Sequence, residues 1–186
     1  IDNLAISGRS SRSFVSCGDW EKLLRRIRKG DYVIISFGHN DVASDANRRT
    51  TPEEFARFHE RFVDDVLARG GHPVLCSPTQ NRRFDGKGVF TPSEYVGERA
   101  DVIRAVAKKR GVDFVDLSAI TKRELETVGC DGSRCYYMVQ RIGNFDNQHT
   151  TRHGARRYAQ LFVEAVRASA SPLADLFVAG ENAKMR

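Results

Sequence analysis

The sequence predicts an α/β domain with a mostly parallel sheet and helices on both of its faces. Short apolar runs alternate along the 186 residues with segments whose apolar residues recur at helical spacing. Two segments, residues 51–54 (TPEE) and 91–94 (TPSE), combine a threonine N-cap with proline at the first helical position and glutamate at the third. Strands that alternate with helices in this way favour parallel pairing through helical crossovers.

Before residue 51, the chain is predicted to contain two strands and one helix. Residues 4–6 are a short strand candidate, and residues 31–37 form an apolar strand that is expected to be buried on both faces. Between them, Asp19 caps a helix that ends before Gly30, which is placed for a left-handed C-terminal conformation. The apolar positions of this helix have the spacing i, i+3, i+4 and i+7: Trp20, Leu23, Leu24 and Ile27.

The rest of the chain continues the alternation of strand and helix. The remaining elements are predicted as helices over residues 51–70, 91–111, 119–128 and 155–168, and as strands over residues 72–76 and 112–117. In parallel sheets the chemistry collects in the loops after the carboxyl ends of the strands. The polar segments to inspect are therefore residues 7–13, 38–41, 77–83 and the irregular stretch 144–153.

Charge and composition exclude several classes of protein. Lys and Arg number 30 against 24 Asp and Glu, which gives a net charge of +6. No continuous basic face or reader motif accompanies this excess, so we expect no nucleic-acid partner. The longest apolar run is far too short to span a bilayer, so we expect no membrane partner. Cys130 and Cys135 either close a small disulfide loop or remain free thiols.

Two of the loops offer groups that suit an anionic ligand or a developing oxyanion. Gly8 presents an unobstructed backbone N–H, and Arg9 and Arg12 can neutralise an anion. The alternative is an ordinary Ser-rich loop with solvated arginines, because such a loop has the same composition. Asn40 can aim its amide N–H at a carbonyl oxygen that gains charge, although Asn-Asp after a strand is also an ordinary turn.

A third loop carries an imidazole and a carboxylate. Asp146 precedes His149 by three residues, so its carboxylate can hold the ring by the Nδ1–H and stabilise the imidazolium. His149 and His153 also have a metal-ligand spacing, but Gly154 at a helix start argues against a continuous helical face, and no metal is expected. The histidines at positions 39, 59 and 72 are expected to be hydrogen-bonded inside the protein or exposed.

Together and in this order, these segments resemble the SGNH (GDSL-like) hydrolase superfamily, and within it the rhamnogalacturonan acetylesterase-like carbohydrate esterases. Residues 3–14 (NLAISGRSSRSF) resemble the second block of the family, and residues 38–41 (GHND) resemble the third. Residues 146–149 (DNQH), followed by Gly154 and Ala155, resemble the fifth. The resemblance covers nearly the whole chain.

The resemblance implies a flavodoxin-like three-layer sandwich and a Ser-His-Asp triad that removes acetyl groups from plant cell-wall polysaccharide, without metal or cofactor. His149 is then the general base and acid, and Asp146 is its orienting carboxylate. The backbone N–H of Gly8 and the side chain of Asn40 are two of three oxyanion donors. We expect a secreted monomer that binds acetylated polysaccharide, with Arg9 and Arg12 attracting acidic sugars.

One block of the family is absent from the sequence. Its Gly-Asp-Ser, which follows the first strand and supplies the nucleophile and the third oxyanion donor, occurs nowhere in the chain. We therefore expect residues 1–186 to be a single SGNH hydrolase domain that is N-terminally incomplete. Such a chain lacks its first strand and its nucleophilic serine and is inactive by itself. The alternative is a catalytically inactive carbohydrate-binding relative that has lost the serine.

Overall fold

The main sheet of the protein is parallel, as the sequence predicts. The computed structural model describes residues 1–139 and 145–177. Three strands of the described chain form this sheet in the order β1 (Tyr32–Ser36), β2 (His72–Cys76) and β3 (Asp113–Val115). Each crossover passes through a long helix, first α3 (Pro52–Ala68) and then α4 (Glu94–Arg110). The α/β class with a parallel sheet is therefore confirmed.

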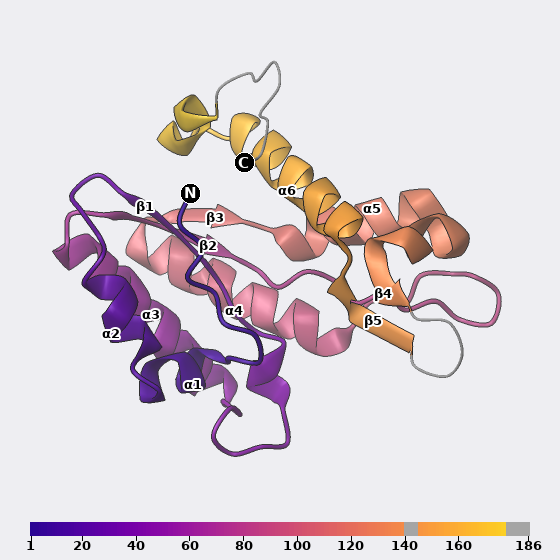
Figure 1. The fold of residues 1–186 in the computed structure, drawn as a ribbon, viewed down its shortest axis with the longest axis horizontal. Helices are drawn as coiled ribbons and strands as arrows, with labels where there is room; N and C mark the ends of the chain where they lie inside the picture. The colour runs from indigo at the N-terminus through magenta and orange to yellow at the C-terminus, as the bar shows by residue number, and fades with distance from the viewer. Residues whose placement is uncertain (140–144, 178–186) are drawn as a thin grey trace.

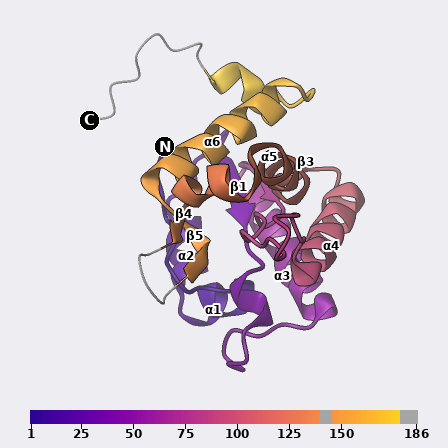
Figure 2. The same cartoon turned by 90° about the vertical axis from the view of Figure 1, so that its right-hand side faces the viewer.

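Helices cover both faces of the sheet (Figures 1 and 2). One face packs against α3, α4 and two short helices, α1 (Ser11–Ser16) and α2 (Asp19–Leu24). The other face packs against α5 (Leu117–Gly132) and α6 (Arg152–Arg167). Successive side chains of a strand point to opposite faces. Leu75 therefore joins the first core, while its neighbours Val74 and Cys76 join the second.

Two predictions about the N-terminal part of the sheet are wrong. Residues 4–6 are not a strand, because their backbone pairs with no strand of the described chain. β1 is not buried on both faces, since Ile34 is 52% exposed. Of β1, only Tyr32 contacts the core under α5 and α6, so these helices leave the middle of the strand open. β1 also lies at an edge of the described sheet.

The two threonine-proline segments behave differently. Thr51 forms the predicted capping box: its Oγ1 accepts the N–H of Glu54 (3.2 Å), and the Glu54 carboxylate accepts the N–H of Thr51 (2.9 Å). In the second segment α4 begins only at Glu94, with Ser93 as its N-cap and no side-chain cap bond. Both polar groups of Ser93 bond outside the helix: Gln80, in the loop after β2, accepts its N–H through Oε1 (3.1 Å), and its hydroxyl accepts the side-chain N–H of Asn81 (3.3 Å).

Other helix ends also differ from the prediction. The cap of α2 is Gly18 instead of Asp19, whose carboxylate pairs with Arg9 and Lys22. This helix ends at Leu24, although Ile27 beyond it still packs against the first core. α5 begins two residues earlier than predicted and extends to Gly132, past a kink at Gly129.

A small antiparallel hairpin stands at one end of the main sheet (Figure 1). It pairs β4 (Tyr137–Val139) with β5 (Phe145–Thr150), so the stretch 144–153, predicted as irregular, contains a strand and the start of α6. Residue 144 lies outside the described residues. The buried Tyr137 hydroxyl donates to the Gln80 carbonyl (2.8 Å) and lies 2.7 Å from the Tyr158 hydroxyl, which ties the hairpin to the loop after β2 and to α6.

Short 3-10 helices complete the described chain: η1 (Asn40–Val42), η2 (Ser133–Tyr136) and η3 (Pro172–Leu176). Within residues 1–139 and 145–177, no helix combines the length and the apolar character that a membrane crossing requires.

Candidate active site

Asp146 and His149 form a hydrogen-bonded pair on β5. Nδ1 of His149 lies 2.8 Å from Oδ2 of Asp146, and the other carboxylate oxygen accepts the backbone N–H groups of Gln148 (3.1 Å) and His149 (2.9 Å). Residues three apart in a regular strand point to opposite faces. The β4–β5 register is irregular between its paired positions, and this irregularity lets the two side chains meet.

The surroundings of this pair keep the carboxylate ionised and the imidazole accessible. Desolvation opposes ionisation of Asp146, but the hydrogen bonds from the His149 and Gln148 backbone and from the His149 ring lower its pKa overall. The His149 side chain is 64% exposed. Its other ring nitrogen, Nε2, has no hydrogen-bond partner among the described residues, so it can accept a proton from an incoming hydroxyl group.

The loops that carry Gly8 and Asn40 lie against each other. The Asn40 side-chain amide donates to the carbonyl of Arg9 (3.1 Å). Beside it, the fully buried Asp41 accepts the backbone N–H of Ser11 (3.1 Å), which is the first residue of α1, and the hydroxyl of Thr50 (3.2 Å). Gly8 adopts a left-handed φ of 76°. The structure thus brings the two predicted oxyanion donors into one region.

His39 belongs to the same region, and its ring is hydrogen-bonded, in agreement with the sequence-based expectation. Its Nδ1 lies 3.0 Å from the Tyr95 hydroxyl, and this hydroxyl also accepts the side-chain N–H of Asn81 (2.7 Å). Burial and the nearby charge of His149 lower the pKa of His39 to about 4, against a weaker opposing bond to the Thr79 backbone. The ring is therefore neutral near pH 7.

His59 and His72 fit the prediction. His59 is fully buried, with Nδ1 2.8 Å from the carbonyl of Phe55, and His72 is exposed. The His153 ring packs at 5.4 Å from the ring of Tyr136. Within the part of the chain that the structure describes, no group of three or more His, Cys, Asp or Glu side chains has the geometry of a metal site.

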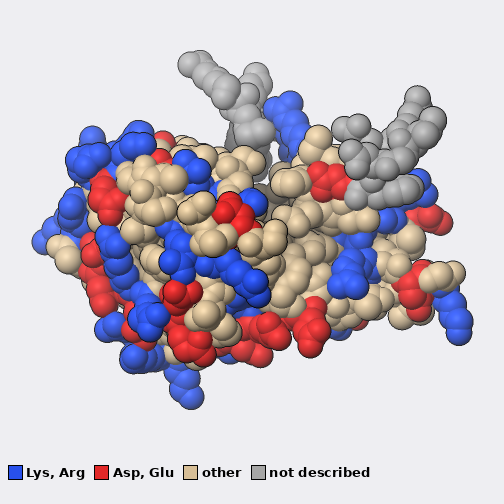
Figure 3. Space-filling model, turned by 90° about the horizontal axis from the view of Figure 1, so that it is seen from below, with Lys and Arg blue, Asp and Glu red and all other residues tan. Residues whose placement is uncertain are grey.

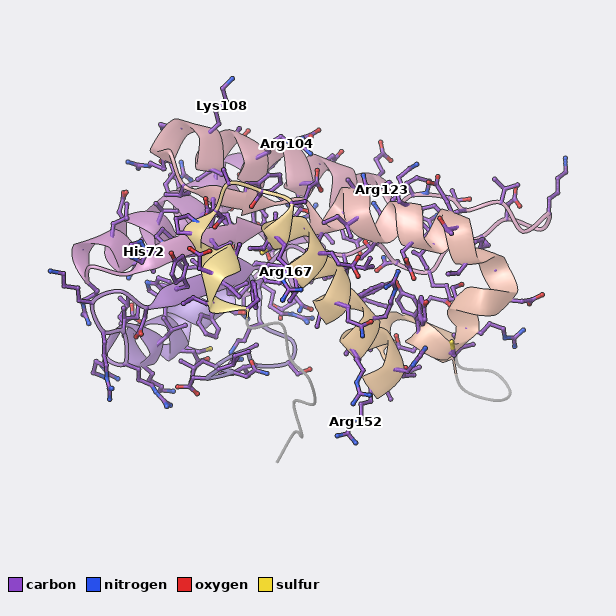
Figure 4. The ribbon with its side chains drawn as sticks, turned by 90° about the horizontal axis from the view of Figure 1, so that it is seen from above. His72, Arg104, Lys108, Arg123, Arg152 and Arg167 are labelled. Atoms are coloured by element: carbon purple, nitrogen blue, oxygen red, sulfur yellow. The ribbon has the colours of Figure 1, made fainter. Side chains whose placement is uncertain are left out.

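Arg9 and Arg12, the residues predicted to bind substrate, already have acidic partners in the protein. Nε of Arg9 lies 2.8 Å from Asp19, and Nη2 of Arg12 lies 2.6 Å from Glu54. Both arginine side chains are 32% exposed, and their role in substrate binding stays a prediction. Basic and acidic residues are interspersed over the face in Figure 3, and Arg152 projects outward from the start of α6 in Figure 4.

Cys130 and Cys135 are free thiols, so the structure favours the second of the two alternatives for them. Sγ of Cys130 instead lies 3.3 Å from Nη2 of Arg82.

Comparison with known proteins decides the family. The model of the GDSL-like lipase/acylhydrolase family matches residues 1–139. The chain belongs to this family. Rhamnogalacturonan acetylesterase RhgT of Bacillus subtilis is 34% identical over 190 residues, which cover 97% of this chain and 80% of that protein. A rhamnogalacturonan acetylesterase of Emericella nidulans is 29% identical over 198 residues, which cover 95% of this chain and 77% of that protein.

Solved structures support the family fold. The crystal structure of YxiM from Bacillus subtilis superposes with a TM-score of 0.76 at 24% identity and covers 89% of this chain. This chain covers only 45% of the YxiM chain. A mutant of the acetylxylan esterase Axe2 from Geobacillus stearothermophilus gives a TM-score of 0.61 at 16% identity, over 87% of this chain and 69% of that one. The resemblance to GDSL-like hydrolases that the sequence motifs indicate is therefore confirmed.

Proposed function

We propose that this member of the GDSL-like family is part of a serine esterase that removes acetyl groups from a plant cell-wall polysaccharide of the rhamnogalacturonan type. The observation that carries the proposal is the hydrogen-bonded Asp146–His149 pair with an open Nε2. The relatives named rhamnogalacturonan acetylesterase support the choice of substrate. The net charge of +6 suits an acidic polymer, and such a substrate places the enzyme outside the cell.

In the proposed reaction, a serine hydroxyl attacks the acetyl carbonyl while Nε2 of His149 takes its proton. Asp146 stabilises the imidazolium through the bond at Nδ1. The amide of Asn40 and the N–H of Gly8 donate to the oxyanion of the tetrahedral intermediate. The intermediate then expels the sugar hydroxyl, which receives the proton from His149 and leaves an acetyl-enzyme. Water attacks this ester by the same route and releases acetate.

The proposal places the nucleophilic serine outside residues 1–186. The family motif Gly-Asp-Ser is absent from the sequence, and the buried serines of the second block have structural roles. Ser10 and Ser13 form the capping box of α1, and the Ser11 hydroxyl donates to Asp41. A strand that carries this motif would fit beside β1, at the edge of the described sheet, where it would cover the exposed Ile34.

The direct test is acetate release by the full-length gene product from acetylated rhamnogalacturonan, with p-nitrophenyl acetate as a second substrate. The parent protein is expected to release acetate, and His149→Ala is expected to lose that activity. His72→Ala, a substitution at an exposed histidine on another strand, is the matched control. Polysaccharide binding without turnover in the parent protein would favour the inactive carbohydrate-binding relative instead.

A further inference from the structure

Arg82 joins three separate parts of the structure near the Asp146–His149 pair. It lies in the loop after β2, and its backbone N–H donates to the carbonyl of Asn147 (2.7 Å). Its guanidinium donates to the Asn147 side chain (3.3 Å), to the Ser133 hydroxyl (3.1 Å) and to the Cys130 carbonyl (2.6 Å). Main chain and side chain of Arg82 therefore both hold Asn147.

Asn147 lies between Asp146 and His149, in the part of β5 whose register with β4 is irregular. The cross-strand pairs of the hairpin, Tyr137 with Thr150 and Val139 with Phe145, flank this segment. A bulged strand segment leaves its extra residues unpaired with the neighbouring strand. In the described hairpin, Asn147 has no paired residue on β4. It is held instead by the bonds from Arg82, which follows a strand of the main sheet.

The guanidinium itself is fixed on the side away from β5. Cys130 and Ser133 belong to the end of α5 and to η2, and Ser133 is fully buried. The Phe84 ring lies under the guanidinium at 5.3 Å. Arginine presents its donors in a planar fork, so one side chain can bond several acceptors in set directions, whereas a lysine ammonium cannot reproduce this pattern.

We propose that Arg82 is a positioning residue: it clamps Asn147 and thereby fixes the segment in which the Asp146 carboxylate orients the His149 imidazole. Arg82 takes no part in proton transfer. Its effect on catalysis rests on the proposed function, whereas its effect on the geometry of the His149 ring does not. Displacement of catalytic groups by about 1 Å typically costs on the order of 10²-fold in rate.

The test measures the His149 ring directly in protein labelled with ¹⁵N-histidine. Long-range ¹H–¹⁵N spectra report which ring nitrogen carries the proton, and the His149 signals are those that vanish in His149→Gln. In the parent protein we expect a single tautomer with the proton on Nδ1. In Arg82→Ala we expect the two nitrogen signals to move toward each other as the second tautomer becomes populated, and in Arg82→Lys a smaller movement of the same kind.

Arg83→Ala is the matched control, because it removes a neighbouring arginine that is exposed. Its His149 signals are expected to coincide with those of the parent. If Arg82→Ala does not fold, Asn147→Ala replaces it, since this variant removes the side-chain acceptor but keeps the main-chain bond. Addition of guanidinium ion to Arg82→Ala is expected to restore part of the parent spectrum.

Kinetics separate this proposal from the proposed function. If the parent protein releases acetate, Arg82→Ala is expected to lower kcat by about 10- to 100-fold with little change in KM. If the parent releases none, the proposed function fails, but the spectra still decide the role of Arg82. His149 signals that are the same in the parent, Arg82→Ala and Asn147→Ala would overturn the positioning role.

Discussion

The carboxylate of Asp41 and the backbone N–H of Ser11 lie 3.1 Å apart in the interior of the protein. This bond joins the loop after β1 to the start of α1, and so it holds together the segments that carry Asn40 and Gly8. Burial raises the pKa of Asp41, and hydrogen bonds from Ser11 and Thr50 oppose that effect. The loops that carry Gly8 and Asn40 are therefore joined through one buried acid.

Replacing Asp41 by alanine is expected to lower the free energy of unfolding by about 2–4 kcal/mol, because several buried donors lose their acceptor. Denaturant unfolding measures this change, and acetate release is expected to fall with it. The control is Asp45→Ala, which removes an exposed aspartate a few residues along the same loop. Equal stability losses in the two variants would contradict the role given to Asp41.

Gly154 is expected to tolerate no side chain. A Cβ atom at this position would stand 2.1 Å from the carbonyl oxygen of Tyr136, so the first turn of α6 would have to move away from η2. Gly154→Ala should destabilise the protein by about 1–3 kcal/mol, the usual effect of overpacking. Gly97→Ala in α4, where a Cβ meets no atom within 4 Å, should instead raise stability by up to about 1 kcal/mol. Thermal unfolding of both variants checks the opposite signs.

The buried His59 makes stability depend on pH. Burial lowers its pKa to about 4, below the value of about 6.5 for histidine in an unfolded chain. Between these values the unfolded state binds more protons than the folded state, so the free energy of unfolding falls as the pH falls from 6.5 to 4. His39 acts in the same direction.

His59→Gln is therefore expected to flatten the dependence of the free energy of unfolding on pH between 6.5 and 4, by an amount on the order of 3 kcal/mol over the whole interval. Denaturant titrations at several pH values provide the measurement. Val63→Ala, at a fully buried position in the same helix that does not titrate, should lower stability at every pH without changing the slope. An unchanged slope in His59→Gln would show that this residue does not set the pH dependence.

Local signals in the sequence predicted the long helices α3, α4, α5 and α6 and the β2 and β3 strands, but not the short helix α1, which lies in a segment predicted as a polar loop. The capping box at Thr51 and the glycine after α4, Gly111, act within a few residues, so they can be recognised without knowledge of the fold. The second threonine-proline segment misled the prediction of a helix start: α4 begins only at Glu94, and the Ser93 N–H bonds to Gln80, thirteen positions earlier. Residues 4–6 have a strand-like composition, but strand formation also needs a partner strand.

In the candidate site, too, a contact between neighbours in sequence could be predicted, whereas contacts between distant segments could not. Asp146 and His149 are close in sequence and could be paired by their spacing alone. Their meeting depends on the irregular register between β4 and β5, and the contacts of His39 with Tyr95 and of Arg82 with Asn147 join segments that are dozens of residues apart. No pattern within one segment reports such contacts, which is why neither contact could be predicted from the sequence.

The most direct test of the esterase account uses a fluorophosphonate probe, which labels only an activated serine, on the full-length gene product. Mass spectrometry of the labelled peptides then locates the modified residue. We expect a single labelled serine outside residues 1–186, and a labelling rate that falls by at least about 10³-fold in His149→Ala but not in His72→Ala. A label on a serine within residues 1–186, or a rate that does not change in His149→Ala, would contradict it.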